Sequence, residues 1–475
     1  MNAPILRLFL VVLVLFAALV AFTSRWTVFE AQALQENPLN ARDVLKELQV
    51  RRGSLRAADG TLLARSVAGS ANTYRREYTD AARDAAHVIG YSYPGPGRAG
   101  VERSRNEALM GAADPLDSVL DELRGRADEG DDVVTTIDLR AQRTAIAALA
   151  GRKGSVVAIE PRTGRVRVMV SVPGFDPGAL GERGAFTALN ADADAPLLNR
   201  ATQARYPPGS TFKVVTAAAA LDTGRFSPDS FVDGSSPKVI DGVALANSGG
   251  RSFGPISLIT ALTFSVNTVW AQVAERLGAS TMDEYMRRFG FYEEPPLDYP
   301  DDQLVPSGVY RSSRLLPLTG GVDVGRVAIG QERLQVTPLQ MAMVAAAVGN
   351  EGQLMRPTLT QRIVDRAGRT LERVEPAGYK DVMAPDAAQR LARMMTNVVA
   401  EGTGTAAALT GVDIAGKTGT AERGAGDVNQ PWFIAFAPVR SARIAIAVTV
   451  ERTIGGQGGT TAAPIARQVL RELLR

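Results

Sequence analysis

The chain of 475 residues has no cysteine and only one histidine, His87. The absence of cysteine excludes disulfides, thiolate metal sites and cysteine nucleophiles. A metal cluster built on histidine is excluded as well. A Ser-His-Asp triad is excluded at the serine motif described below, because His87 lies far ahead of that motif in the sequence. We expect His87 to be a surface or structural residue.

The sequence also has little excess charge, since 53 lysines and arginines against 50 aspartates and glutamates give a net charge of +3. No run of basic residues is interleaved with aromatic ones, so the composition predicts no nucleic-acid partner. The hydrophobic share of 45% and the charged share of 22% are ordinary for a globular protein. At this length two or more domains are expected.

One long apolar run is present at the N-terminus, where every residue from Leu8 to Phe22 is apolar. Its length lies between that of a signal-peptide core and that of a full membrane span. We expect an uncleaved anchor over residues 1–26 rather than a cleaved signal or a buried core helix, because the Ala-x-Ala at Ala31–Ala33 lies too far beyond the run. Arg7 and the amino terminus favour a cytoplasmic start, and Trp26 would suit the far interface.

Residues 27–132 are expected to form a small, extended α+β pedestal domain that holds the next domain off the membrane. Arg52–Ala64 is typical of a β-hairpin with Asp59-Gly60 in its turn. A polar run with glycine at Ala127–Asp132 predicts the boundary with a second domain, residues 133–475.

The pattern of the second domain predicts one sheet covered by helices, with a helical insert, and so a multi-domain α/β protein. The expected segments are a helix at Thr136–Leu149, a hairpin of Gly154–Ile159 and Arg165–Val170, a mostly helical stretch at 198–399 interrupted by Pro295–Pro317, strands at Gly411–Glu422, Trp432–Pro438 and Ala442–Glu451, and a helix at Ala463–Leu474. Because the early hairpin and the late strands belong to one sheet, the two ends of this domain are expected to meet in space.

Three short motifs stand in one order along the chain: Ser210-Thr-Phe-Lys213, Ser265-Val-Asn267 and Lys417-Thr418-Gly419-Thr420. Each motif alone is weak, and Ser-x-x-Lys also occurs at Ser235–Lys238. There a proline prevents helical registry, whereas Ser210 opens the buried-helix pattern Val214–Leu221. Further Ser-x-Asn matches at 70–72 and 104–106 lie outside the domain that carries Ser210.

The first motif supplies a serine nucleophile and a base that is not histidine. On a helix, residues i and i+3 share a face, so Lys213 is expected beside the Ser210 hydroxyl. Lysine can act as a base when burial and a nearby cation lower its pKa far below about 10.4, and Lys417 is the candidate cation. The helix N-terminus adds N–H groups where oxyanion charge develops. The alternative for Ser210 alone is an ordinary helix N-cap.

The second and third motifs supply a proton relay and a docking strand. The Ser265 hydroxyl could relay a proton between Lys213 and a leaving group, and the Asn267 amide could bond both a lysine and a substrate amide. Lys417 and the threonine hydroxyls after it would bind a terminal carboxylate. Gly419 removes a side chain where another backbone approaches, so that an acyl donor could pair as an added strand. The alternatives are a polar break between helices and a solvent-facing strand with a bulge glycine.

Together these motifs resemble those of the penicillin-binding proteins, the serine D,D-peptidases of bacterial wall synthesis, and the spacings between the motifs agree with that family. Other family-like pieces are Arg52-Gly53 with Asp59-Gly60, Tyr206–Lys213, Ile329-Gly-Gln331 with Thr337–Gln340, and Trp432–Pro438. The resemblance covers nearly the whole chain. It is closest to the class B enzymes, and among them to the short penicillin-binding protein A group of Gram-positive bacteria.

The resemblance implies a fold and a reaction. A serine β-lactamase-like transpeptidase domain with an antiparallel sheet would follow a class B dimerisation-like pedestal. Ser210 would be acylated by a stem peptide ending in D-Ala-D-Ala, with release of D-alanine, and an amine of a neighbouring stem peptide would resolve the acyl-enzyme into a cross-link. The backbone N–H groups of Ser210 and Thr420 would form the oxyanion hole, and β-lactams would acylate Ser210 as stalled mimics.

The resemblance also implies roles, partners and a location. The catalytic residues would be Ser210, Lys213, Ser265, Asn267 and Lys417, and the residues that bind substrate or β-lactam would be Thr418, Gly419 and Thr420. Such enzymes need no metal and no cofactor. The protein would sit in the cytoplasmic membrane by a single pass, with its catalytic domain on the extracytoplasmic side, beside a membrane-embedded glycan polymerase.

Two other functions would use the same motifs. A serine β-lactamase or D,D-carboxypeptidase would pass the acyl group to water, and a β-lactam sensor or wall-assembly scaffold would not need turnover. Class A β-lactamases carry Ser-Asp-Asn as the second motif, whereas the middle residue here is Val266. Glu293–Asp298 has a faint likeness to the loop of their water-activating glutamate, and we interpret it as a surface loop. A bifunctional enzyme would need a glycosyltransferase domain, for which too few residues precede the boundary.

Overall fold

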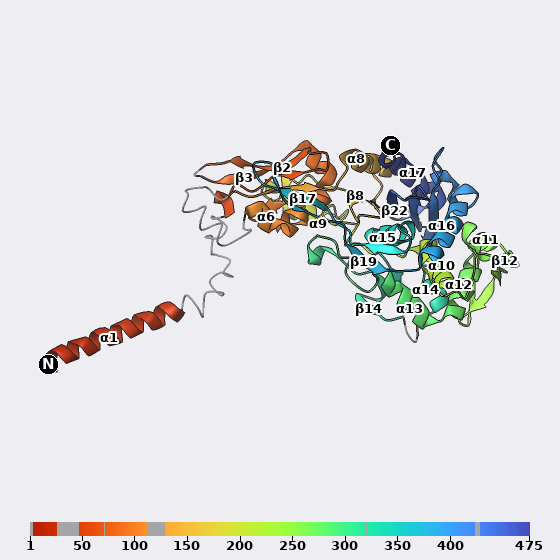
Figure 1. Cartoon of the computed structure of the whole chain (residues 1–475), viewed down its shortest axis with the longest axis horizontal. Helices are drawn as coiled ribbons and strands as arrows, with labels where there is room; N and C mark the ends of the chain where they lie inside the picture. Colours follow the sequence, from red (N-terminus) through yellow and green to blue (C-terminus); the bar gives the residue numbers. More distant parts are fainter. Residues whose placement is uncertain (1–2, 26–46, 71, 112–128, 319–320, 423–427) are drawn as a thin grey trace.

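The computed structural model describes residues 3–25, 47–70, 72–111, 129–318, 321–422 and 428–475. Its first element is helix α1, Ala3–Ser24. At 1.5 Å per residue this helix is roughly 33 Å long, which is enough to cross a bilayer core of about 30 Å. It is apolar apart from Arg7, Thr23 and Ser24, and none of it is buried against the rest of the chain (Figure 1). The helix is therefore exposed as a membrane anchor would be, unlike a buried core helix.

The pedestal is built on a six-stranded sheet with the order β18-β17-β6-β1-β2-β3. Its strands are β1 (Leu55–Arg56), β2 (Leu62–Ala68), β3 (Tyr74–Tyr78), β6 (Asp132–Thr135), β17 (Thr360–Val364) and β18 (Thr370–Arg373). The expected hairpin is confirmed, because β1 pairs antiparallel with β2. In its turn Gly60 has a φ of +86°, and the Thr61 N–H donates to Asp59 Oδ1 at 2.9 Å.

Smaller elements complete the pedestal around this sheet. They are helices α4 (Ala86–Ile89), α5 (Gly100–Ser104) and α6 (Asn106–Met110), and the short strands β4 (Ser92–Tyr93) and β5 (Gly97–Arg98). His87 lies in α4, where its Nε2 is 2.8 Å from the Pro196 carbonyl oxygen and burial lowers its pKa to about 4. This histidine is thus a structural residue, as expected.

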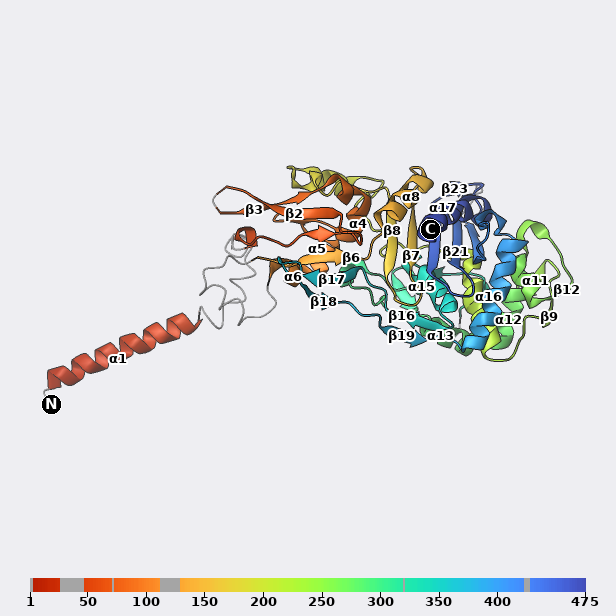
Figure 2. The same cartoon turned by 45° about the horizontal axis from the view of Figure 1, so that its top comes forward.

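Two strands of the pedestal sheet come from far along the sequence. β17 pairs antiparallel with β6, with Ile363 opposite Val133, and Figure 2 shows β17 and β18 alongside the pedestal strands. The prediction of a mostly helical stretch at 198–399 is wrong for these two strands. All four residues of β18 are exposed, so this strand has no apolar alternation that would mark it in the sequence.

Asp298 holds this long connection in place. Its carboxylate accepts hydrogen bonds from the N–H of Leu359 at 2.6 Å, from the N–H of Thr360 at 3.0 Å and from the guanidinium of Arg105 in the pedestal at 2.8 Å. The segment Glu293–Asp298, which we interpreted as a surface loop, therefore ends in a contact between the two halves of the chain.

The second sheet has the strand order β20-β21-β22-β7-β8. Its strands are β7 (Gly154–Ile159), β8 (Val166–Val172), β20 (Ala415–Glu422), β21 (Val428–Ala437) and β22 (Ile444–Val450), and β23 (Thr453–Ile454) pairs with β21. β7 pairs antiparallel with both β8 and β22. The predicted hairpin and late strands are confirmed as one sheet, and the early and late parts of the domain do meet.

Helices cover both faces of this sheet. Val156 and Ile446 pack into the cluster of α8 (Leu139–Leu149) and α17 (Ala463–Leu473), whereas Val157 and Ala447 pack on the side of α15 (Pro338–Gly349). The period-2 alternation of a strand explains this division. Helix α8 begins at Leu139 rather than at the predicted Thr136, because Asp138 caps it by accepting hydrogen bonds from the N–H groups of Arg140 and Ala141.

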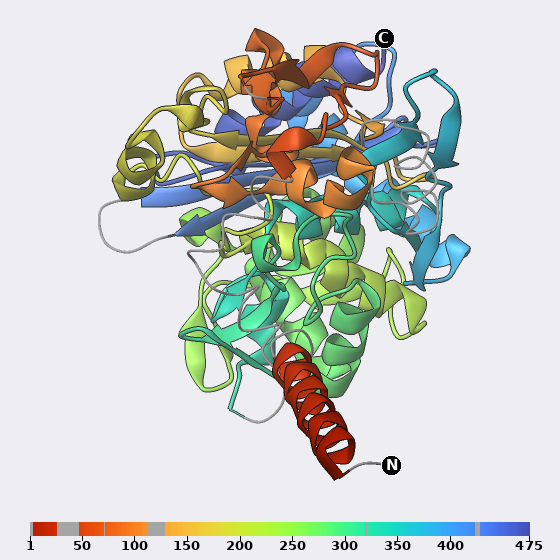
Figure 3. The same cartoon turned by 90° about the vertical axis from the view of Figure 1, so that its left-hand side faces the viewer.

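The helical part lies on the α15 side of the sheet, and Figure 3 shows it in green below the blue and gold strands. Its helices are α10 (Lys213–Asp222), α11 (Leu258–Thr263), α12 (Asn267–Leu277), α13 (Ala279–Arg288), α14 (Val324–Ala328) and α16 (Pro385–Ala400), and α9 (Ala185–Ala191) precedes them. The predicted helical stretch is also interrupted by short strands: β9 (Phe231–Asp233), β10 (Lys238–Ile240), β11 (Val243–Leu245), β12 (Pro255–Ser257), β13 (Gly308–Arg311), β14 (Arg314–Leu316), β15 (Leu334–Gln335), β16 (Gln353–Met355) and β19 (Gly378–Asp381).

Candidate active site

Ser210 lies in a tight turn that leads into the buried helix α10. Residues Gly209–Phe212 form a single 3-10 turn, and α10 begins at Lys213. Every residue of α10 from Lys213 to Leu221 is buried, as the apolar pattern predicts. A hydrogen bond of 3.0 Å from Trp432 Nε1 to the Pro207 carbonyl oxygen holds the residues that precede the turn. The structure thus places a half-exposed serine at the start of a rigid, buried helix.

The Lys213 ammonium is bound by the second motif. Its Nζ donates to Asn267 Oδ1 at 2.7 Å, to the Ser265 carbonyl oxygen at 2.8 Å and to Ser265 Oγ at 3.2 Å. No hydrogen bond joins Lys213 to the Ser210 hydroxyl among the described residues, although the two share one turn. The second motif therefore positions the candidate base.

Lys417 also donates to the Ser265 hydroxyl. Its Nζ donates to Ser265 Oγ at 2.9 Å and to the Thr418 carbonyl oxygen at 2.9 Å. The Ser265 oxygen accepts from both lysines, so its own proton is free to be donated elsewhere. The three motifs, far apart in the sequence, meet at this single oxygen.

Both lysines are fully buried, and neither forms an ion pair with a described carboxylate. Burial lowers the pKa of Lys213 well below its ordinary value, and the nearby charge of Lys417 lowers that pKa further. Burial also lowers the pKa of Lys417 to about 7. Desolvation and a like charge are the two effects that convert a lysine into a base near neutral pH.

The backbone of the second motif is strained at Ser265. Its φ is +59°, a left-handed conformation that costs free energy for a residue with a side chain and is concentrated at functional sites. Val266, the middle residue, is buried in the core. Asn267 begins α12, and its Nδ2 donates to the Ala246 carbonyl oxygen at 3.1 Å. The strained residue thus presents both its hydroxyl and its carbonyl oxygen to Lys213.

Strand β20 touches the Ser210 turn through glycine backbone. A Cβ added to Gly419 would lie 2.7 Å from the Pro208 carbonyl oxygen, and one added to Gly209 would lie 2.9 Å from the carbonyl carbon of Thr420. On the far side of the turn, a Cβ on Gly330 would lie 1.9 Å from the Gly209 carbonyl oxygen. The protein's own turn therefore approaches Gly419 closely, and the approach of a donor backbone to Gly419 stays a prediction. Sequence reasoning noted Gly330 only as a family-like piece.

The two threonines of the third motif have different partners. Thr418 shares a hydrogen bond of 2.6 Å with the hydroxyl of Thr403, a residue that the sequence analysis missed. Thr420 Oγ1 accepts the Gly458 N–H at 3.2 Å, which leaves its hydroxyl proton available. No short motif surrounds Thr403 or Gly458, so only the fold could find them.

The second Ser-x-x-Lys match has no such surroundings. Ser235 Oγ donates to Asp233 Oδ1 at 2.6 Å, and Lys238 Nζ donates to Asp233 Oδ2 at 2.6 Å. Both side chains are thus occupied by one surface carboxylate. Glu293, in the loop with a faint likeness to a β-lactamase element, binds Lys380 and Tyr379 at the surface.

The family described as penicillin binding protein transpeptidase domain matches residues 154–471, and the penicillin binding protein A dimerisation domain matches residues 52–133. The chain is 35% identical to the peptidoglycan D,D-transpeptidase PbpA of Mycolicibacterium smegmatis, over 100% of this chain and 99% of that protein. Identity to PbpA of Mycobacterium tuberculosis is 33% over the same shares. The structure of penicillin-binding protein A from M. tuberculosis, a ceftriaxone acyl-enzyme complex, is 32% identical with a TM-score of 0.82, covering 91% of this chain and 100% of that one.

Proposed function

The chain belongs to the penicillin-binding protein transpeptidases, and from this premise we propose that it cross-links peptidoglycan stem peptides through an acyl-enzyme on Ser210. It is a peptidoglycan D,D-transpeptidase, and neither family that it matches is a glycosyltransferase. The assignment of residues rests on one observation: two buried lysines, Lys213 and Lys417, share the hydroxyl oxygen of Ser265.

Acylation begins with the proton of Ser210. The depressed pKa of Lys213 lets it lose its own proton far more readily than an exposed lysine, so that it can accept the proton of Ser210 Oγ. Lys213 must turn from Asn267 toward the serine, and such contacts commonly tighten only when substrate is bound. Oγ then bonds to the carbonyl carbon of the penultimate D-alanine, and the bond to the terminal D-alanine breaks. The leaving nitrogen takes the Ser265 proton, which Lys213 replaces.

The oxyanion would be held by the backbone N–H groups of Ser210 and Thr420. Thr420 lies opposite Pro431 in the β20–β21 ladder, and proline has no N–H. The Pro431 carbonyl oxygen accepts Thr449 Oγ1 at 3.1 Å on the side of β22. In an antiparallel pair of this kind the Thr420 N–H points away from β21, toward the free edge beside the Ser210 turn. Two N–H groups that converge there would stabilise the developing charge.

The terminal carboxylate of the donor would bind near Lys417. Lys417 supplies the positive charge, Thr420 has a free hydroxyl proton, and Thr418 lies on the same strand. The free edge of β20 would take the donor backbone, and Gly419 lets the Ser210 turn lie close to that strand. A bound carboxylate also raises the pKa of Lys417, so the lysine stays charged while the substrate is present.

The acyl-enzyme would be resolved by an amine rather than by water. Hydrolysis needs a positioned water with its own base. Among the described residues, no carboxylate hydrogen-bonds to a side chain of the three motifs. An incoming amine can instead give its proton back through Ser265 to Lys213, by the reverse of the route that served the leaving group.

The test uses the purified full-length protein in detergent and uncross-linked glycan strands with stems ending in D-Ala-D-Ala. Free D-alanine and cross-linked muropeptides are quantified together by mass spectrometry. We expect equal amounts of both, complete loss in Ser210→Ala, and no change in Ser235→Ala, the matched control at the second Ser-x-x-Lys. D-Alanine release without cross-links would overturn the proposal in favour of a D,D-carboxypeptidase.

We also propose that α1 stays in the cytoplasmic membrane, with residues 27–132 as a pedestal whose sheet is completed by β6, β17 and β18, and with the rest of 133–475 as the catalytic domain on the extracytoplasmic side. Deleting residues 1–26 should give soluble protein that still binds penicillin, and full-length protein in the soluble exported fraction would contradict this. A membrane-embedded glycan polymerase is the proposed partner, because the matched families supply no polymerase. Cross-linking from the pedestal should recover a multi-pass membrane protein, and failure to recover one argues against it.

A further inference from the structure

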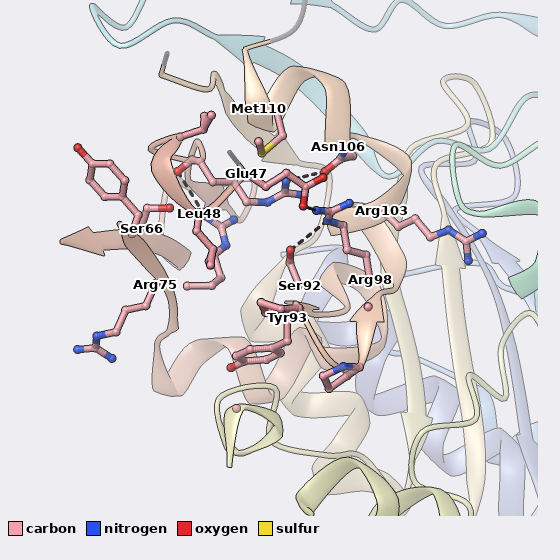
Figure 4. Close-up of a pocket in the computed structure, with 18 of the residues that line it drawn as sticks. Glu47, Leu48, Ser66, Arg75, Ser92, Tyr93, Arg98, Arg103, Asn106 and Met110 are labelled. Carbon is pink, nitrogen blue, oxygen red and sulfur yellow. Dashed lines mark hydrogen bonds and ion pairs between the residues drawn. The ribbon is translucent and has the colours of Figure 1, made fainter. Parts of the chain in front are cut away.

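The pedestal contains a hollow that the transpeptidase reaction does not use. Its volume is about 930 Å³, within the range of roughly 300–1,000 Å³ that is typical of ligand sites. It is lined by strand β3, the β4–β5 hairpin, helix α6 and the segment Glu47–Val50, which enters the pedestal (Figure 4). No residue of the three motifs lines it.

The hollow is strongly basic. Among the described residues that line it, one is acidic, Glu47, and five are arginines: Arg52, Arg75, Arg76, Arg98 and Arg103. Figure 4 shows Arg75 and Arg103 extending outward on opposite sides, so that they form its rim. Arginine keeps its charge at any physiological pH and matches the geometry of carboxylates. The lining therefore favours an anionic ligand.

The inner wall has more positive than negative charge. The fully buried carboxylate of Glu102 accepts Arg52 Nε at 2.7 Å and Arg76 Nε at 2.6 Å. One carboxylate thus serves two guanidinium groups, which leaves one positive charge uncompensated at this wall. A buried charge attracts a counter-ion more strongly than an exposed charge does, because less water surrounds it and the local dielectric constant is lower.

Arg76 has an unused donor there. Its side chain is only 4% exposed, its Nη1 donates to the Gly53 carbonyl oxygen at 2.7 Å, and its Nη2 has no hydrogen-bond partner. A buried N–H without an acceptor costs about 1–3 kcal/mol. The Arg76 guanidinium therefore adds positive charge to the inner wall without a full set of acceptors.

The chain itself shows how the hollow holds a carboxylate. Arg98 donates to the Glu47 carboxylate, and its Nε donates to Ser92 Oγ at 3.3 Å. Glu47 is 41% exposed and Arg98 27% exposed, so this ion pair is open to exchange. Beside it, apolar or aromatic side chains complete the lining: Leu48, Val50, Tyr74, Tyr93, Pro94, Pro96 and Met110. The segment of this chain that lies in the hollow therefore offers an acidic residue, Glu47, followed by the apolar residues Leu48 and Val50.

We propose that this hollow binds an acidic, apolar-flanked peptide segment of a partner protein. The partner's carboxylate replaces Glu47 on Arg98, and the uncompensated positive charge at Arg52 and Arg76 adds to its attraction. A peptide fits better than a lipid headgroup for two reasons. The lining combines arginines with an apolar wall, and β3 is the edge strand of the pedestal sheet, so its free backbone groups can pair with an added strand.

The test uses full-length protein in dodecyl maltoside and a fluorescein-labelled peptide with the sequence of residues 43–50, Asp-Val-Leu-Lys-Glu-Leu-Gln-Val. Binding is followed by fluorescence polarisation at two salt concentrations. We expect saturable binding that weakens with salt. Glu47→Ala removes the internal competitor and should tighten binding by about tenfold, and Arg98→Gln should weaken it by about tenfold or more. A peptide with glutamine in place of its glutamate should also bind more weakly.

The matched control is Arg311→Gln, at an exposed arginine of β13 outside the hollow, which should change nothing. Acylation by penicillin shows that each variant is folded. If Arg98→Gln fails that check, Arg75→Gln at the exposed rim replaces it and should weaken binding several-fold. No saturable binding to Glu47→Ala, or equal affinity in the arginine variants, overturns the proposal. So does arginine-dependent binding of dihexanoyl-phosphatidylglycerol without binding of the peptide, which would assign the hollow to a lipid headgroup.

Discussion

A Cβ on Gly419 would lie 2.9 Å from Cγ2 of Thr211 and 3.1 Å from its nitrogen, so strand β20 and the Ser210 turn are in contact through bare backbone. Overpacking of a tight contact costs about 1–3 kcal/mol. In Gly419→Ala the strand must move away from the turn, so the Thr420 N–H on the strand moves away from the Ser210 N–H on the turn, and the proposed oxyanion hole widens. We expect acylation by a fluorescent penicillin to slow by roughly 10- to 100-fold.

The control for this change is Gly378→Ala on β19. A Cβ there would meet only Gln353 Nε2, at 3.6 Å, which is ordinary contact. Its acylation rate should equal that of the wild type. A Gly419→Ala variant that acylates at the wild-type rate would show that the spacing between strand and turn does not matter for the reaction.

We expect Lys213→Met to lower the acylation rate strongly and to change the free energy of unfolding only a little. Losing the base should lower the acylation rate by about 10²–10⁴-fold. The change removes a buried charge but leaves the acceptors on Ser265 and Asn267 unpaired, so the two effects on the free energy of unfolding oppose each other. The midpoint of thermal unfolding should therefore move by only a few degrees. Lys380→Met, at a surface lysine paired with Glu293, is the control and should leave the acylation rate unchanged.

The rate of acylation should pass through a maximum as pH rises. It increases as Lys213 loses its proton, at a pKa that burial and Lys417 hold well below the ordinary value. It decreases as Lys417, with its pKa lowered to about 7, loses the charge that binds the carboxylate. The second-order rate constant with penicillin, measured from about pH 5 to about pH 10, should thus peak well below the ordinary lysine pKa of about 10.4. A rate that still increases at the upper end would contradict the roles of both lysines.

The same pKa of Lys417 predicts how folding stability changes with pH. In the unfolded chain the pKa is about 10.4, whereas in the folded protein it is about 7. Between these values the unfolded state binds more protons, so the free energy of unfolding should increase with pH across this window. Below the folded pKa the whole cost of the buried charge is present. Denaturant titrations of wild type and Lys417→Met should show that the slope is smaller in the variant, and equal slopes would refute the lowered pKa.

The penicilloyl-enzyme should persist far longer than one catalytic cycle. Its slow release follows from the lack of a described carboxylate at the motifs. Glu294→Ala should leave the lifetime unchanged, because we assign Glu294 to a surface loop next to Glu293, which is bound by Lys380. The measurement is release of labelled penicillin from wild type and variant. Release within seconds in the wild type, slowed by Glu294→Ala, would favour a β-lactamase.

The sequence predicted the elements whose signals are local. The hairpin of β7 and β8 was visible from the apolar run at Gly154–Ile159 and the alternation after it. The buried helix after Ser210 was visible because it is apolar on every side. The convergence of Lys213, Ser265 and Lys417 followed from the order of the three motifs rather than from any one of them.

The remaining features depend on contacts between distant parts of the chain. Gly330 supports the Ser210 turn from behind, and nothing around it in the sequence distinguishes that role from a loop glycine. The left-handed backbone of Ser265 is held by its neighbours and not by its residue type. The hollow in the pedestal required Glu47, Arg76 and Arg98 to be brought together by the fold.

The position of β6 between β1 and β17 has a consequence for how the protein is made. A nascent chain that emerges N-terminus first exposes the open edge of β6 until Thr360–Val364 has followed. At about 5–20 residues per second this interval is on the order of ten seconds or more. An unpaired strand edge invites wrong pairing with other chains. A holding chaperone would therefore find a client surface on the half-built pedestal, before the strands on both sides of Ser210 have been made.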